Sequence, residues 1–246
     1  VQFGYSTVAA QADSIACGNC DACGSPKFSF FAEMPAAGSG YGFGAFTGCP
    51  LLHGYDFTSE STVVVVQPEA FMGALDLAVV DIGVDVHTIG DRAFKGTTGL
   101  NRLLGGSGLT SIGKEAFSES TLSGVFPLSN SLAFLGEDAF RGTRITTFHT
   151  GSTLTEIGAG AFEFSTLRVV SLGPNVAVIG TDAFRSCRQL ETVEIQSTNL
   201  AEIGPGAFID CIRLTTFELP QNSNALSILG PSAFANTPRL RTFDLG

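Results

Sequence analysis

Three cysteines near the amino end of the chain, Cys17, Cys20 and Cys23, follow one another at Cys-x-x-Cys-x-x-Cys spacing. This spacing can supply thiolates to a metal ion or an iron–sulfur cluster, with Cys49 as a fourth ligand. The segment between Cys23 and Cys49 is far longer than the spacing between cysteines in a ferredoxin-type iron–sulfur motif. We therefore predict that two of these four cysteines form a disulfide in an amino-terminal cap. A metal site at Cys17, Cys20 and Cys23, or unpaired thiols, are the alternatives.

The other residues that could do chemistry are scattered along the chain. His53, His87 and His149 lie far apart, and no His-x-x-x-His pair is present for a zinc hydrolase site. No Gly-x-Ser-x-Gly motif stands between a suitable strand and helix. The glycine-rich stretch 38–42 lacks the lysine and the following helix of a phosphate-binding loop. The sequence thus predicts no catalytic residues, no cofactor and a protein that is not an enzyme.

The charge and hydropathy of the chain argue against several kinds of ligand. Its net charge of -10 and pI near 4.6 disfavour nucleic acid or anionic lipid as the main partner. Apolar residues make up 44% and charged residues 15%, so the chain can form a substantial core. No run approaches the roughly 18 apolar residues of a membrane-spanning helix. The chain starts at Val1, and we expect that any targeting segment has been removed.

A repeated phrase, Ile-Gly-x-x-Ala-Phe, determines how most of the chain must be organised. Its clearest copy is Ile179–Phe184, and residues 41–246 hold about nine copies. The repeated phenylalanines are Phe46, Phe71, Phe94, Phe117, Phe140, Phe162, Phe184, Phe208 and Phe234. Their step of about 23 residues falls inside the range of leucine-rich repeats. Residues 1–40 lack the phrase, and we interpret them as a cysteine-bearing cap or tail.

A second phrase, Leu-x-x-Val-x-Leu, follows each phenylalanine, as in Leu190-x-x-Val193-x-Ile195. Its last two apolar positions alternate, which is typical of a half-buried strand. The same strand in successive coils would stack in parallel about 4.8 Å apart. On the other side we expect short strands, turns and helical turns, with one helical turn at Gly113-Lys114-Glu115. The glycine of the first phrase permits a backbone turn that a Cβ would hinder.

The two phrases together resemble the BspA-like leucine-rich repeat family, whose repeats run Leu-x-x-Ile-x-Ile-Pro and then Val-x-x-Ile-Gly-x-x-Ala-Phe-x-x-Cys. Residues 167–187 match this pattern best, and the resemblance extends over roughly residues 41–246. It implies a curved leucine-rich repeat solenoid of the α/β class, mostly β, with a parallel sheet on one face. It also implies a protein that binds other macromolecules, often as a surface or secreted adhesin, without catalytic residues.

Three cysteines lie in the repeat itself, each three residues after a phenylalanine. Cys49, Cys187 and Cys211 occupy a slot that holds Ala, Ser or Thr in the other copies. Such a slot is typical of small buried residues, and free cysteine commonly behaves as one. Cys187 and Cys211 stand at the same position of adjacent coils, so their Cα atoms should lie about 5 Å apart, within disulfide range. We predict that both are nevertheless reduced.

Function would then lie in the residues that the repeat leaves variable, which should point outward from the sheet. The middle coils present Leu104 and Phe126, an exposed apolar patch of the kind that binds partners. The Phe126→Asp change is expected to weaken partner binding without unfolding the protein. An acidic, threonine-bearing stripe, suited to a basic partner or a cation, follows in the later coils. With His149, the residues of this stripe are Thr192, Glu194, Thr216, Glu218, Thr242 and Asp244.

The sequence therefore predicts a non-enzymatic module for protein–protein interaction, adhesin-like or receptor-like, at the cell surface or secreted. The alternative is a structural subunit built permanently into a larger complex, for example in an organelle lumen after removal of a targeting segment. For the outward residues the alternative is an ordinary solvated sheet surface. We expect protein partners, no nucleic acid and no membrane span of the chain itself. The native size of the protein would separate a lone module from a subunit.

Overall fold

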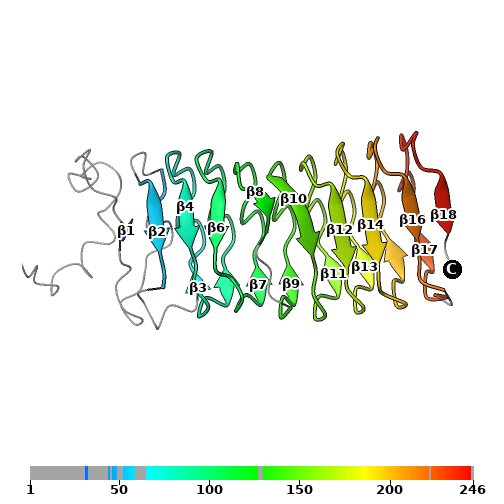
Figure 1. The fold of residues 1–246 in the computed structure, drawn as a ribbon, viewed down its shortest axis with the longest axis horizontal. Helices are drawn as coiled ribbons and strands as arrows, with labels where there is room; N and C mark the ends of the chain where they lie inside the picture. The colour runs from blue at the N-terminus through cyan, green and yellow to red at the C-terminus, as the bar shows by residue number, and fades with distance from the viewer. Residues whose placement is uncertain are drawn as a thin grey trace, which may run out of the picture.

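The computed structural model describes residues 31–32, 44, 46–48, 52–58, 65–126, 130–221 and 223–244. Within these residues the chain winds into an elongated stack of coils, and Figure 1 shows the strands following one another along the long axis. Each coil contributes one strand to a front sheet and one short strand to a back sheet. The predicted solenoid with stacked parallel strands is confirmed.

From β2 onward the front sheet is formed by the Leu-x-x-Val-x-Leu phrase, and it divides into two parts. One part has four strands, β1 (Phe31–Ala32), β2 (Gly54–Asp56), β4 (Val79–Asp81) and β6 (Arg102–Leu104). The other has six strands, β8 (Ser123–Val125), β10 (Arg144–His149), β12 (Val169–Leu172), β14 (Thr192–Ile195), β16 (Thr216–Glu218) and β18 (Thr242–Asp244).

The back sheet is formed by the two residues before each repeat glycine, and it also has two parts. The first comprises β3 (Val65–Val66), β5 (Thr88–Ile89), β7 (Ser111–Ile112) and β9 (Phe134–Leu135). The second comprises β11 (Glu156–Ile157), β13 (Val178–Ile179), β15 (Glu202–Ile203) and β17 (Ile228–Leu229). The front sheet breaks between β6 and β8, whereas the back sheet breaks further along the stack, between β9 and β11.

The repeated phenylalanines form a continuous ladder through the core. Consecutive rings from Phe46 to Phe234 lie nearly parallel, with centroids 5.1 to 5.5 Å apart. The rings from Phe71 to Phe208 are fully buried. Stacked aromatic pairs contribute about 0.5–1.5 kcal/mol each beyond the area that they bury. The phenylalanine period of the sequence is therefore the period of the core.

The Ala-Phe segment is a chain of turns, and the predicted helical turns were wrong. In the coil of Phe117, the amides of Glu115, Phe117 and Glu119 donate forward to carbonyl oxygens of the next coil, each at 2.8 Å. Only the amides between them bond within the coil, as Ser118 does to Glu115. A helix would need every amide to bond backward within its own coil. Stacking of the coils takes half of these amides and so prevents a helix.

Two residues in each turn adopt the left-handed backbone conformation, one two residues before the phenylalanine and one two residues after it. Around Phe117 they are Glu115 with a φ of 54° and Glu119 with a φ of 60°. Non-glycine residues rarely adopt this conformation. The positions before the ring are Gly44, Glu69, Arg92, Glu115, Asp138, Gly160, Asp182, Gly206 and Ser232, and those after it are Gly48, Gly73, Gly96, Glu119, Gly142, Phe164, Ser186, Asp210 and Asn236. The forward hydrogen bonds hold this strained pattern in the coils from Phe46 to Phe208, and the coil of Phe234 keeps the same two left-handed positions.

The glycine of the Ile-Gly phrase is needed for close packing of successive coils. A Cβ on Gly204 would lie 2.6 Å from the backbone nitrogen of Thr181 and 2.7 Å from the carbonyl carbon of Gly180. Side chains essentially never approach a backbone that closely, so the preceding coil would have to move. The sequence argument correctly required a residue without a Cβ, but the obstacle is the neighbouring coil and not the dihedral angle of a turn.

The cysteine slot of the repeat is buried as predicted. Cys187 and Cys211 are fully buried free thiols. Their sulfur atoms contact the carbonyl oxygens of Phe162 and Phe184, at 3.0 and 3.1 Å. Burial raises the pKa of Cys187 to about 12 and also raises the pKa of Cys211, so both stay protonated at neutral pH. Protonated thiols of this kind are poor nucleophiles and poor metal ligands.

Candidate interaction surface

The outward side of the front sheet, which we call the front face, carries the residues that vary between coils. Strand pairing places Thr192 beside Thr216 and Thr216 beside Thr242. The same column continues through Val169 to Thr147 on β10. The structure therefore brings the three threonines of the predicted stripe into one row. Their half-buried to exposed side chains flank the core residues Val193 and Phe217.

The acidic column of the predicted stripe lies at the carboxyl ends of the front strands. His149, Glu194, Glu218 and Asp244 are all exposed there. His149 pairs with Ser171, which pairs with Glu194, and Glu218 pairs directly with Asp244. Like charges on adjacent strands destabilise a sheet by a small amount. The pairing of Glu218 with Asp244 therefore places two carboxylates side by side on the outward side of the sheet.

Phe126 is not on the front face, contrary to the sequence prediction. Its side chain is 3% exposed and its ring packs edge-on against Phe117 and Phe140, with centroids 5.5 and 4.8 Å away. Pairing of β8 with β10 shifts register by one residue within β10. Such a shift turns each side chain to the other side of the sheet. Phe126 therefore enters the core at the level of Phe148, and Val125 takes the outward position.

The apolar patch of the middle coils consists of Leu104 and Val125. Leu104 is 36% exposed on β6 and Val125 is 64% exposed on β8. Val125 stands in the column of Thr147 and the half-buried Val169. The two exposed side chains lie on either side of the break in the front sheet. The sequence predicted Leu104 correctly but not Val125, because the spacing of the repeat does not show that Phe126 takes the core position in this coil.

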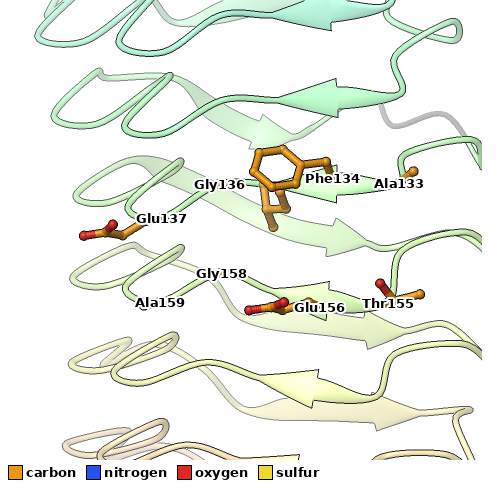
Figure 2. A pocket seen from close by; sticks show the side chains of 9 residues that line it. Ala133, Phe134, Gly136, Glu137, Thr155, Glu156, Gly158 and Ala159 are labelled. Carbon is orange, nitrogen blue, oxygen red and sulfur yellow. The ribbon is translucent and has the colours of Figure 1, made fainter.

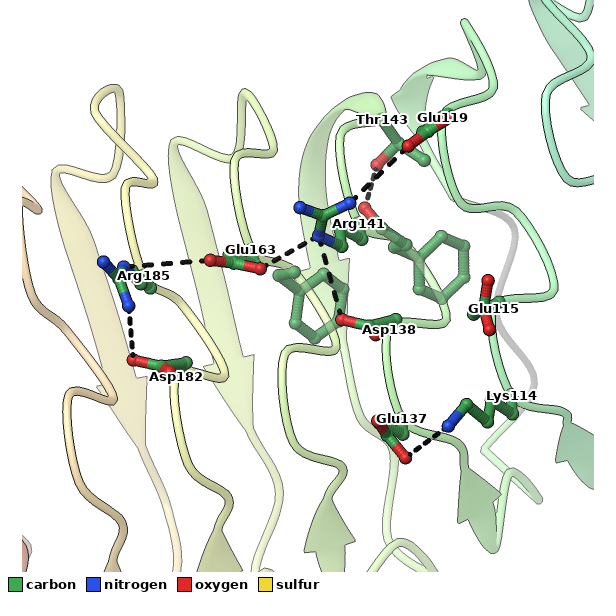
Figure 3. A network of polar contacts seen from close by, with 12 residues as sticks. Lys114, Glu115, Glu119, Glu137, Asp138, Arg141, Thr143, Glu163, Asp182 and Arg185 are labelled. Carbon is green, nitrogen blue, oxygen red and sulfur yellow. Dashed lines mark hydrogen bonds and ion pairs between the residues drawn. The ribbon is translucent and has the colours of Figure 1, made fainter.

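The charged residues of the Ala-Phe turns, which we call the turn ridge, bind one another. Figure 3 shows Arg141 between Glu119, Asp138 and Glu163, with its Nε 2.9 Å from an oxygen of Glu163. Glu163 also reaches Arg185 on the next coil, at 3.8 Å. The guanidinium of Arg141 lies 5.4 Å from the ring centroid of the exposed Phe164. These contacts link successive coils, and the ridge's basic side chains Arg92, Lys95, Lys114, Arg141 and Arg185 all have carboxylate partners.

The same network continues at its amino-terminal end and shifts several pKa values. A hydrogen bond from Lys95 lowers the pKa of Glu115, and Arg92 adds to the effect. A hydrogen bond to Glu137 raises the pKa of Lys114. Asp138 behaves oppositely, because partial burial raises its pKa more than Arg141 lowers it. Both Glu115 and Lys114 thus remain charged around neutral pH, held by partners on neighbouring coils.

A shallow depression of about 320 Å³ lies where the back sheet breaks between β9 and β11. Figure 2 shows Phe134 and the carboxylate of Glu137 on one coil and the carboxylate of Glu156 on the next. Glu137 already binds Lys114 at 2.8 Å. The lining otherwise consists of Thr155 and small or backbone groups. The depression brings together one aromatic ring and two carboxylates, without a nucleophile and a base in contact.

The predicted cysteine sites fall outside the part of the chain that the structure describes. This applies to Cys17, Cys20, Cys23 and Cys49, so their pairing stays a prediction. Within the described ranges, no group of three His, Cys, Asp or Glu residues could hold a metal ion. In the same ranges there is no helix of the length and apolar character that crossing a membrane requires. His53 and His149 are exposed on different coils and His87 on a third.

Comparisons with known proteins agree with the coil geometry. The family described as BspA type Leucine rich repeat region matches residues 41–168 and 133–246, with 6 copies of the repeat. No curated protein matches the chain significantly. A leucine-rich repeat protein of T. pallidum is 31% identical over 66% of this chain and 78% of its own length, with a TM-score of 0.58.

Two further solved structures are more distant. The pneumococcal vaccine antigen PcpA is 19% identical with a TM-score of 0.43, and the match covers 79% of this chain but only 54% of that protein. A leucine rich cell surface protein of Faecalibacterium prausnitzii A2-165 is 18% identical with a TM-score of 0.41, over 82% of this chain and 68% of that one. The family match spans the stacked coils from end to end, and the chain belongs to the BspA type leucine-rich repeat family.

Proposed function

We propose that this protein is a non-enzymatic, adhesin-like module that binds a protein partner through its front face. One observation carries the proposal: the recurring residues of the repeat are buried in the described coils that precede the last one, whereas the front face presents exposed residues that differ from coil to coil. Charges on the turn ridge bind each other, so the ridge has fewer groups to offer a partner. Family membership supports an interaction role, because stacked repeats create extended binding surfaces.

The front face suits a partner with an apolar centre and a basic flank. Leu104 and Val125 supply the apolar patch, where desolvation would contribute most of the affinity. Glu194, Glu218 and Asp244 would attract basic side chains and raise the association rate. The threonine row between them offers hydroxyl groups for hydrogen bonds.

Paired variants test the front face. The double change Leu104→Ser/Val125→Ser should abolish capture of native partners, which mass spectrometry identifies, while the thermal unfolding temperature stays unchanged. Phe134→Ser is the matched control, because Phe134 is 56% exposed but lies on the back sheet. Glu194→Gln/Glu218→Gln should slow association and weaken its salt dependence. Capture that survives both front-face variants would refute the proposal.

The proposed location is the cell surface or the secreted fraction, as is common for the family that the chain resembles. Protease treatment of intact native cells should remove the protein while cytosolic markers survive. Full protection of the protein would rule this location out. The other reading, a subunit of a permanent assembly, predicts a native mass far above that of one chain. The comparisons give no support to a location in an organelle lumen.

A further inference from the structure

Exposed arginines gather along one edge of the front sheet in an otherwise acidic protein. They lie in the loops that lead from the phenylalanine turns into β10, β12, β14, β16 and β18, at the amino ends of these strands in Figure 1. We call this set the arginine strip. Its members are Arg144, Arg168, Arg188, Arg213, Arg239 and Arg241, and all of them are exposed. In the earlier described coils the corresponding segments contain one arginine, Arg102 at the first position of β6, and one aspartate, Asp76.

Backbone hydrogen bonds fix the alignment of the strip across the coils. The amide of Glu191 donates to the carbonyl of Arg168 at 2.9 Å, and the amide of Thr215 donates to the carbonyl of Glu191 at 3.3 Å. The amide of Arg241 donates to Thr215 at 2.9 Å. Arg213 and Arg239 each precede the core leucine of their coil, Leu214 and Leu240. The arginines therefore lie on neighbouring coils and form one charged edge.

The strip differs from the turn ridge in how its charges are compensated. On the ridge, Arg92, Lys95, Lys114, Arg141 and Arg185 each contact at least one carboxylate. In the strip, Arg144, Arg188, Arg239 and Arg241 contact none within 4 Å among the described residues. The protein as a whole has a net charge of -10, so the positive charge of the strip results from the placement of these arginines and not from the overall composition. It produces a local field that attracts anionic groups.

The one carboxylate within the strip shows what the arginines can bind. Glu191 lies between two arginines, with Oε1 3.4 Å from Arg168 and 3.5 Å from Arg213. Its carboxylate bridges coils that are two apart in the chain. Guanidinium groups match carboxylates in geometry, which makes arginine the preferred cation for such pairs. Further carboxylates at similar spacing could occupy the arginines that lack one.

We propose that the arginine strip binds an acidic polypeptide segment, a carboxylate-rich part of a protein partner. The proposal rests on the proposed function, and it names the partner chemistry at a second edge of the front face. Ile212, 42% exposed between the coils of Arg188 and Arg239, gives an apolar contact that a peptide can use and a sulfated polysaccharide cannot. The acidic column lies three to six residues further along the chain, in Glu194, Glu218 and Asp244, so the two edges select opposite charges.

Binding of labelled poly-L-glutamate to the intact protein at low ionic strength tests the strip. The triple change Arg213→Gln/Arg239→Gln/Arg241→Gln should raise the dissociation constant about tenfold, because each exposed ion pair contributes a few-fold. Glu191→Gln should tighten binding a few-fold, since it removes the carboxylate that already occupies two arginines. The control Arg92→Gln/Lys114→Gln/Arg185→Gln makes the same charge change on the turn ridge and should leave binding unaltered.

Several results would overturn the proposal. Equal binding by the strip variant and wild type would mean that the strip does not hold carboxylates. Tighter binding of heparin than of poly-L-glutamate at equal charge would assign the strip to sulfated polysaccharide. Dimerisation of the wild type that the strip variant loses would assign it to a second copy. Leu104→Ser/Val125→Ser should not affect poly-L-glutamate binding, so failure of the front-face proposal and failure of this one remain distinguishable.

Discussion

Gly124 adopts a φ of 82°, and one more residue separates Leu122 from Phe126 than separates Ile145 from Phe148 in the next coil. Leu122 and Ile145 are both buried at equivalent places, as are Phe126 and Phe148. The pairing of β8 with β10 is irregular at this place, because Thr146 of β10 is left over between Ile145, which pairs with Gly124, and Thr147, which pairs with Val125, in the manner of a β-bulge. Around this irregularity the ring of Phe126 enters the core and Val125 faces outward.

Substitution of these two neighbours should have opposite consequences for stability. Phe126→Ala should lower the free energy of unfolding by about 3–5 kcal/mol, since it leaves a cavity among Phe117, Phe140 and Phe148. Val125→Ala should change it by less than about 0.5 kcal/mol, because the side chain is mostly in water. Urea denaturation measures both. A destabilising Val125→Ala together with a neutral Phe126→Ala would reverse the assigned orientations.

Two carboxylates on the turn ridge should give opposite pH dependence. The folded-state pKa of Glu115 is lowered by Lys95, so its contribution is present above the unfolded pKa of about 4.3 and is lost as the pH falls below it. The folded-state pKa of Asp138 is raised by partial burial, so its charge costs stability at neutral pH and this cost disappears in acid. Protonation of the two groups therefore moves the stability in opposite directions.

Matched amide variants measure these contributions. Glu115→Gln should destabilise the protein by about 0.5 kcal/mol at pH 7, and the difference from wild type should vanish near pH 3. Asp138→Asn should stabilise it by a few tenths of a kcal/mol at pH 7, helped by the tolerance of asparagine for the left-handed conformation that position 138 adopts. Urea titrations across this pH range report both. Parallel pH profiles of all three proteins would contradict the assignment.

At the scale of a coil, two kinds of glycine have different roles. Gly204 has the backbone of the preceding coil 2.6 Å from where a Cβ would be. Gly96 has a φ of 68° and open space around its Cα. The first is constrained by packing and the second by its own dihedral angle, although both occur at regular positions of the repeat.

Alanine at these glycines should separate the two constraints. Gly204→Ala should cost about 1–3 kcal/mol or more, because the stacked coils must move apart to admit the methyl group. Gly96→Ala should cost about 1 kcal/mol, the penalty for alanine in a left-handed conformation. Gly96→Asn should recover part of that loss, whereas Gly204→Asn should be worse than Gly204→Ala. Chemical denaturation of the four variants checks the order, and equal losses at both sites would refute it.

The parts of the coil that follow a strict period could be predicted from sequence. The phenylalanine ladder, the parallel strands and the row of Thr192, Thr216 and Thr242 all follow from residue type and spacing. The left-handed positions could not be predicted, because they accept Gly, Glu, Arg, Asp, Ser, Asn and Phe. The arginine strip was missed for another reason. The gap between phenylalanine and leucine is five residues in some coils and six in others, which hides the alignment of its members in the sequence.

At the scale of the molecule, the breaks in the two sheets are staggered. Where the front sheet is interrupted between β6 and β8, the back strands stay paired through β5, β7 and β9 and the rings of Phe94 and Phe117 stack at 5.2 Å. Where the back sheet is interrupted between β9 and β11, front strands β8, β10 and β12 stay paired and Phe140 stacks on Phe162 at 5.5 Å. Neighbouring coils are joined by front-strand pairing, back-strand pairing and ring stacking, and each interrupted junction keeps two of these three contacts.

This staggering predicts that the described coils unfold together, since cooperativity in a solenoid depends on every interface between neighbouring repeats. Gly204→Ala in the carboxyl-terminal coils should lower the protection of amides in residues 65–104 as well as those near the substitution. Native-state hydrogen exchange read by mass spectrometry measures protection in both regions. If the interrupted junctions divided the stack, only the carboxyl-terminal peptides would exchange faster. The amide of Gly180 donates a hydrogen bond to the carbonyl of Ile157 on the preceding coil, whereas the amide of Gly158 makes no equivalent bond. The amide of Gly158 should therefore exchange faster than that of Gly180 in either case, and it provides an internal reference for local opening.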